Sequence, residues 1–188
     1  MMYRVGLPLF LCVLTTLVCS STFINSAFLI DLCADETPAS TAKLVDAIAT
    51  AKADKNTDLN TLVNTQTDIG ESLLHLACIW GDPIKVKALL EAGADPNFRA
   101  NKQRSSLEMT PLTWCAYAGY TDAVEMFVKD KGTNVNVIVR KEDGGSHTAL
   151  DIALLIGERG AAEAKLLVDA GAKTYEQILQ EVKGHDEI

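Results

Sequence analysis

The sequence predicts an all-α fold in which similar helix-turn-helix units stack into a solenoid, with one additional helix at the C-terminal end. Three segments, beginning at Ser72, Thr110 and Thr148, share one pattern and are equally spaced along the chain. Each contains two stretches with the apolar period of an amphipathic helix, and a glycine follows each stretch. One such helix pair cannot bury its apolar faces alone, so neighbouring units must cover one another.

The first helix of each unit begins at a hydroxyl residue, whose side-chain oxygen can accept a hydrogen bond from the free N–H groups of the first turn. In the second unit Pro111 follows at the first helical position, where no N–H is needed. Small residues within this helix allow close approach of neighbouring helices, and the helix ends at a glycine that can take a left-handed conformation. The small residues are Ala77, Cys78, Cys115, Ala116 and Ala153, and the glycines are Gly81, Gly119 and Gly157.

The second helix of each unit carries a cluster of large apolar residues on one face. The clusters are Val86, Leu89 and Leu90, then Val124, Phe127 and Val128, and finally Leu166, Leu167 and Val168, with terminating glycines at Gly93, Gly132 and Gly171. In the second unit, Trp114 occupies a core position of the first helix, so we expect it to pack between units.

The motif residues of the first unit identify the type of repeat. Ser72, Leu74 and His75 match a Thr-Pro-Leu-His start, Gly81 separates the helices, and residues 93–97 read Gly-Ala-Asp-Pro-Asn. This pattern resembles the ankyrin repeat. The resemblance implies that His75 is structural and bridges backbone and hydroxyl groups within its repeat.

The resemblance divides the chain into an apolar leader, an ankyrin-repeat domain, and a C-terminal helix and tail. The expected ranges are 1–30 for the leader, 38–173 for the domain and 174–188 for the helix and tail. Within the domain we expect an N-terminal cap unit at 43–64 and repeats at 68–97, 106–136 and 144–173. The linkers near 98–107 and 137–146 are longer than the family norm, so the hairpin fingers should be extended there.

The second and third repeats depart from the motif. Thr113 and Asp151 replace the histidine, so we expect the hydrogen bond between the N-cap and the histidine only at Ser72 and His75. The third repeat also has a longer turn between its helices.

The end of each first helix carries the predicted recognition surface. Two positions there face the concave groove in the ankyrin family, and here they are occupied by Ile79 and Trp80, Tyr117 and Ala118, and Leu155 and Ile156. An apolar stripe of this kind indicates a surface for a partner protein, with the aromatic residues as anchors. The expected protein-binding residues are Asp68, Ile69, Glu71, Ile79, Trp80, Leu107, Met109 and Tyr117. The alternative for Leu155 and Ile156 is that the C-terminal amphipathic helix around Tyr175 to Val182 covers them.

The apolar N-terminal leader predicts that the folded part of the chain lies outside the cytosol. Residues 5–30 carry no charged side chain, and the densest apolar run, 5–18, has the length of a signal-peptide core. The small polar residues that follow Val18 favour a cleaved secretory signal, with Val18 and Ser20 at the small-residue subsites. The alternative is an uncleaved membrane anchor, which would make the protein a subunit or assembly factor of a membrane complex.

The C-terminus resembles a second targeting signal, the alternative being a flexible acidic end. Residues 185–188 read His-Asp-Glu-Ile, which resembles the endoplasmic-reticulum retrieval signal His-Asp-Glu-Leu. In a eukaryote this indicates retention in the lumen of the endoplasmic reticulum, whereas in a bacterium the protein would be periplasmic, secreted or anchored in the inner membrane.

Composition excludes other classes of function. The net charge of -8 opposes nucleic-acid binding. Three cysteines lie outside the leader, Cys33, Cys78 and Cys115. They are too few for a disulfide framework or a zinc site, so we expect buried thiols.

Two other groups of residues have only part of a functional pattern. A catalytic triad is not expected from Ser146, His147 and Asp151, because the first two are adjacent in a turn. Residues 54–61 begin like a calcium loop but lack its glycine and closing glutamate, so a capped helical turn is expected there. We therefore predict a non-catalytic adaptor or scaffold with no cofactor, no metal and a protein partner.

Overall fold

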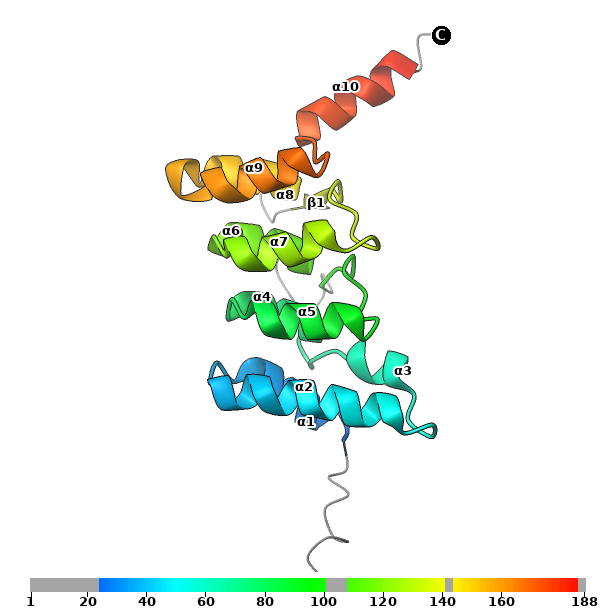
Figure 1. Ribbon diagram of the computed structural model, residues 1–188. Coiled ribbons are helices and arrows are strands. Elements are labelled where there is room, and N and C mark those ends of the chain that lie inside the picture. The colour runs from blue at the N-terminus through cyan, green and yellow to red at the C-terminus, as the bar shows by residue number, and fades with distance from the viewer. Residues whose placement is uncertain (1–23, 101–107, 141–143, 186–188) are drawn as a thin grey trace, which may run out of the picture.

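The computed structural model describes residues 24–100, 108–140 and 144–185, and it confirms the all-α solenoid. Helix pairs lie one above another in a single elongated stack (Figure 1). The first helices of successive pairs are α1 Ser26–Ala34, α4 Leu73–Ile79, α6 Pro111–Ala118 and α8 Ala149–Leu155. The second helices are α2 Pro38–Ala53, α5 Pro83–Glu91, α7 Thr121–Lys129 and α9 Ala161–Asp169.

Shorter elements connect or extend these pairs. Helix α3 Leu59–Val63 follows α2, the 3-10 turn η1 Gly157–Gly160 joins α8 to α9, and α10 Tyr175–His185 ends the described chain. Strands β1 Val139–Arg140 and β2 Ser146–His147 pair antiparallel before α8, with Val139 opposite His147. The lengthened turn of the third repeat is thus confirmed as η1. Its Gly160 lies so close to the Ala153 carbonyl oxygen that a Cβ there would overlap it.

The hydrophobic core is continuous along the stack, from Leu29 in α1 to Leu167 in α9. A smaller cluster of Met109, Val139 and Ile152 lies beneath the β-hairpin. Trp114 packs against both clusters, as expected of a residue between repeats. Each repeat therefore depends on its neighbours for burial of its apolar surface.

The N-terminal unit is a full helix pair rather than the half-matching unit expected at 43–64. Helix α1 packs against α2 and α4, and its Leu29 and Cys33 are fully buried. Residues 26–30, which the sequence analysis placed in the leader, belong to α1. These residues lack charge because they start a helix with a buried face. Residues 1–23 lie outside the described part of the chain.

An asparagine ladder joins the successive units. The side chains of Asn64, Asn97 and Asn136 each donate to a carbonyl oxygen of the next unit, at Gly93, Gly132 and Gly171, over 3.2, 2.8 and 3.2 Å. The same three side chains accept from the backbone N–H groups of Asp95, Asn134 and Lys173, each at 2.7 Å. Each asparagine side chain thus gives a hydrogen-bond partner to one backbone carbonyl and one backbone N–H in the turn of the next unit. These two bonds fix the spacing between the units.

A buried lysine joins the N-terminal unit to the first repeat. Lys85 in α5 is fully buried, and its Nζ donates to the carbonyl oxygens of Leu32 and Asp35 and to Ser40 Oγ. The two carbonyls lie at the C-terminal end of α1, where helix carbonyls lack partners and the helix dipole favours a cation. Asp82, the N-cap of α5, accepts from Thr41 Oγ1 of α2 and holds a second contact between the same units.

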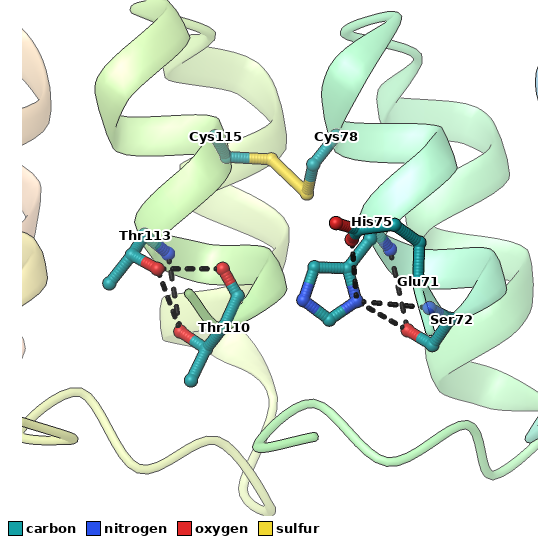
Figure 2. Close-up of a disulfide and its surroundings, with 7 residues drawn as sticks. All are labelled: Glu71, Ser72, His75, Cys78, Thr110, Thr113 and Cys115. Carbon is teal, nitrogen blue, oxygen red and sulfur yellow. Dashed lines mark hydrogen bonds and ion pairs between the residues drawn. A yellow bond between two sulfur atoms is a disulfide. The ribbon is translucent and has the colours of Figure 1, made fainter. Parts of the chain in front are cut away.

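His75 ties the first repeat to the second. Its Nε2 lies 2.9 Å from the Met109 carbonyl oxygen, which can only accept, so Nε2 carries the proton. Its Nδ1 accepts from the backbone N–H and hydroxyl of Ser72 at 3.2 and 2.8 Å (Figure 2). His75 thus has the structural role that the resemblance implied. The hydrogen bond between the N-cap and a histidine is found at Ser72 and His75, as expected, and at Thr148 the Asp151 carboxylate takes the place of the imidazole by accepting from the Thr148 N–H.

Stability should depend on pH through His75. Burial lowers the pKa of His75 from 6.5 to about 4, although the hydrogen bond to Met109 opposes this shift. Between pH 6.5 and about pH 4, the His75 imidazole is protonated in the unfolded chain but neutral in the native state. The free energy of unfolding should therefore fall by about 3 kcal/mol as the pH falls from about 6.5 to about 4. Chemical denaturation at a series of pH values, compared with His75→Gln, isolates this contribution. A variant with the same pH slope as the native protein would contradict the assignment.

Candidate protein-binding surface

An exposed apolar row follows the ends of the first helices. Trp80 at the end of α4 is 44% exposed, Tyr117 in α6 is 60% exposed and Leu155 in α8 is 67% exposed. We call these three residues the binding stripe. Helices α4, α6 and α8 contact one another in sequence, so the stripe runs along the stack. Of the other expected positions, Ile79 and Ile156 are half-buried and Ala118 is exposed.

The side chain of Tyr117 is positioned by contact with the Trp114 ring. Its ring meets the Trp114 ring edge to face, with centroids 6.0 Å apart and planes at 81°. Such aromatic pairs are favourable beyond their burial. Because Trp114 is half-buried and packs against both core clusters, Tyr117 is a positioned aromatic side chain that is open to a partner, as interface anchors are.

Only some of the residues that were expected to lie beside the binding stripe are exposed. Asp68 and Ile69 are exposed in the turn before α4. Glu71 is buried, with its Oε2 3.7 Å from His75 Nδ1 (Figure 2), and Met109 is buried in the cluster with Val139 and Ile152. These two residues were wrongly assigned to the surface, because the segments before α4 and α6 turn inward to meet His75. Leu107 lies outside the described residues.

A disulfide joins Cys78 in α4 to Cys115 in α6 (Figure 2). The two Cα atoms are 4.9 Å apart and both side chains are fully buried. The expectation of buried thiols is therefore wrong for this pair. The cysteines are 37 residues apart, one fewer than the repeat spacing, so they occupy facing sides of neighbouring first helices. That offset was the sequence signal for the bond.

The disulfide joins the two first helices whose ends carry Trp80 and Tyr117 of the binding stripe. Cys78 precedes Trp80 by two residues, and Cys115 precedes Tyr117 by two. The bond therefore fixes the spacing of the two helix ends that carry the aromatic anchors. Cys33 remains a thiol, and burial raises its pKa to about 12, which keeps it protonated and unreactive.

The last repeat leaves an open depression at the end of the stack, lined by His147, Asp151, Leu154 and Leu155. The high exposure of Leu155 shows that α10 does not cover it, which removes the alternative to the stripe at that residue. Ser146 and His147 are consecutive in β2 and so point to opposite faces. Asp151 is occupied by hydrogen bonds from Thr148 and from the Tyr175 N–H. This arrangement is not a catalytic triad.

The remaining candidate sites have structural explanations. Asp58 caps α3 by accepting from Thr61, and Asp54 accepts from Asn56 and Thr57, so residues 54–61 form a capped turn. These hydrogen bonds lower the pKa of both carboxyl groups. Across residues 24–100, 108–140 and 144–185, no group of three or more His, Cys, Asp or Glu side chains could hold a metal ion. Over the same residues, no helix is long and apolar enough to cross a membrane.

Comparison with known protein families agrees with this architecture. A family model for three copies of the ankyrin repeat matches residues 39–139 and 74–178. The chain belongs to the ankyrin-repeat family. Ankyrin repeats act in general as non-catalytic modules for protein interaction, and the exposed stripe is a surface suited to that role.

Several curated ankyrin-repeat proteins resemble the chain. It is 34% identical to pig (Sus scrofa) NF-kappa-B inhibitor alpha over 119 residues, which cover 61% of this chain and 35% of the relative. It is 35% identical to the Arabidopsis thaliana ADP-ribosylation factor GTPase-activating protein AGD2, over 53% of this chain and 12% of that protein. It is 30% identical to the Drosophila melanogaster neurogenic locus Notch protein, over 70% of this chain and 4% of that protein. The chain thus spans about a third or less of each of these relatives.

Proposed function

We propose that this ankyrin-repeat protein is an adaptor or scaffold that holds a partner protein on its binding stripe. The main support for this proposal is that Trp80, Tyr117 and Leu155 are exposed at the ends of three consecutive first helices. Large apolar side chains in such a row would be costly to leave in water unless a partner covers them. Tyr117 is positioned by Trp114, and the disulfide spaces the two aromatic anchors, so little order would be lost on binding.

The proposal includes an extracytoplasmic setting. The Cys78–Cys115 disulfide supports it, because such bonds persist in the secretory pathway and the periplasm and are rare in the cytosol. The apolar run at 5–18 and the His-Asp-Glu-Ile end support it from the sequence, although residues 1–23 and 186–188 lie outside the described structure. Cleavage after Ser20 would leave the Asn25 cap of α1 intact. N-terminal sequencing of the mature chain separates a cleaved signal from a membrane-anchored subunit.

Removing the two aromatic anchors should abolish partner recovery. We expect Trp80→Ala/Tyr117→Ala to lose at least tenfold in captured partner when the protein is recovered from its native compartment, because buried aromatic anchors contribute about 2 kcal/mol or more each. The matched control is Val45→Ala/Ile84→Ala, which removes exposed apolar side chains from the second helices α2 and α5. Circular dichroism checks that each variant remains folded before its partner recovery is compared.

Two outcomes would contradict the assignment of this surface. The first is unchanged recovery of the same partner by the folded Trp80→Ala/Tyr117→Ala variant. The second is an equal loss in the Val45→Ala/Ile84→Ala control, which would show that binding does not depend on the stripe.

A further inference from the structure

The interfaces inside the stack show which positions a following unit covers. The sixth residue after the N-cap of each first helix is Cys78, Ala116 or Leu154. Cys78 and Ala116 are fully buried because the next repeat packs on them. Leu154 is 56% exposed, and within the described residues up to His185 a single helix, α10, follows α9.

The second helices repeat this relationship. Leu90 in α5 and Val128 in α7 are partly buried against the core, and the corresponding Val168 in α9 is 56% exposed. We call Leu154 and Val168 the end face. The end face presents apolar side chains at the positions that form the interfaces between repeats inside the stack. It therefore has the same kind of surface that one repeat of this chain uses to pack against the next.

Helix α10 belongs to the same end of the molecule and has an apolar face of its own. Its Leu179 and Val182 are 36% and 55% exposed. In Figure 1 this helix rises obliquely away from α8 and α9 rather than lying across them. Within residues 24–100, 108–140 and 144–185, the end face and the apolar face of α10 are therefore both exposed at the same end of the stack (Figure 1).

Hydrogen bonds hold α10 away from its own end face. The Tyr175 N–H donates to Asp151 Oδ2 and the Thr148 hydroxyl donates to the Lys173 carbonyl, both at 2.8 Å. The Lys173 N–H is fixed by the last rung of the asparagine ladder, and its Nζ pairs with Glu181 of α10 at 2.6 Å. These contacts set the direction in which α10 leaves the stack, so it is not free to fold back over Leu154.

We propose that the end face is covered by a second copy of this chain. The two stacks meet end to end about a two-fold axis, and α10 of each copy lies across α8 and α9 of the other. A two-fold axis makes each copy contribute the same two surfaces, so both apolar surfaces are buried by one contact. The contact covers α8, which carries Leu155 of the binding stripe, and leaves the two aromatic anchors Trp80 and Tyr117 of both copies open, so dimer formation and anchoring by these two residues can be tested separately.

The mass of the purified full chain in solution tests this proposal. Light scattering coupled to size exclusion should give twice the 20.3 kDa chain mass, with dissociation on dilution. Leu154→Glu/Val168→Glu and, independently, Leu179→Glu/Val182→Glu should each give the monomer mass. Ile69→Glu/Ile84→Glu, at exposed apolar residues elsewhere, should remain dimeric.

The substituted side chains are exposed, and circular dichroism verifies that each variant keeps its helix content. A native chain that is monomeric at its highest soluble concentration would overturn the proposal. A dimer that persists in either folded end variant, or that is lost in the Ile69→Glu/Ile84→Glu control, would also overturn it.

Discussion

Replacing Lys85 by alanine is expected to lower the free energy of unfolding by about 3 kcal/mol or more. The buried Nζ donates at 2.8 Å to Leu32 and 3.0 Å to Ser40 Oγ, and it also donates to the Asp35 carbonyl. Without Lys85 the buried Leu32 carbonyl loses its donor, and an unmet buried acceptor costs about 1–3 kcal/mol, whereas the Asp35 carbonyl keeps the hydrogen bond from the Ser40 hydroxyl. The lost side-chain volume adds a cavity at the contact between the N-terminal unit and the first repeat.

Urea denaturation followed by circular dichroism measures this loss. Lys87→Ala is the matched control, because Lys87 lies two residues away on the same helix, is exposed, and pairs with Glu91 across solvent. Its loss should cost at most about 0.5 kcal/mol. Equal stability of the Lys85→Ala and Lys87→Ala variants would show that the buried lysine does not join the two units.

Reduction of the Cys78–Cys115 disulfide is expected to lower the free energy of unfolding by about 4 kcal/mol. The two cysteines are 37 residues apart, and a cross-link of this span restricts the unfolded chain by about that amount. Cys78→Ala/Cys115→Ala should be similarly less stable than the oxidised protein, because both positions are in the core.

Thermal unfolding with and without a phosphine reductant checks this expectation. The reductant should lower the melting temperature of the native chain and leave that of the double variant unchanged. Cys33→Ala should keep the full response to reductant, since Cys33 is outside the bond. A native chain indifferent to the reductant would contradict the disulfide and remove the structural support for an oxidising compartment.

Much of the fold could be predicted because it depends on local and periodic signals. Ser72, Thr110 and Thr148 cap their helices as expected, each accepting from the N–H three residues on. Left-handed glycines such as Gly119 end them. These features act within a few residues of one another and repeat along the chain, so the sequence reveals them without knowledge of tertiary contacts.

The contacts between units could not be predicted in the same way. Lys85 is 53 residues from Leu32 and 50 from Asp35, and a lysine on an amphipathic helix normally indicates an exposed position. In the sequence Asn97 is only the last residue of the repeat motif at 93–97, and the pattern does not indicate that its side chain and that of Asn136 bond the next unit. Such roles depend on which surfaces the stack brings together.

The exposure of the candidate residues was predictable where burial follows helix periodicity. Trp80 and Tyr117 are exposed at helix ends, as the pattern indicated. Glu71 and Met109 lie in irregular segments without a period, and only the structure shows that the Met109 carbonyl meets His75. Exposure therefore agreed with the sequence pattern at the helix ends and differed from it in the segments that precede them, and protein binding at these residues stays a prediction.

Site-specific photocrosslinking in the native compartment tests the central claim most directly. A benzophenone amino acid at Tyr117, on the binding stripe, should form a covalent adduct with another protein. The same amino acid at Lys87, exposed on the second helix α5, should form little or none. Adducts that are as abundant from Lys87 as from Tyr117, or absent from Tyr117, would contradict the claim that this chain holds its partner on the ends of its first helices.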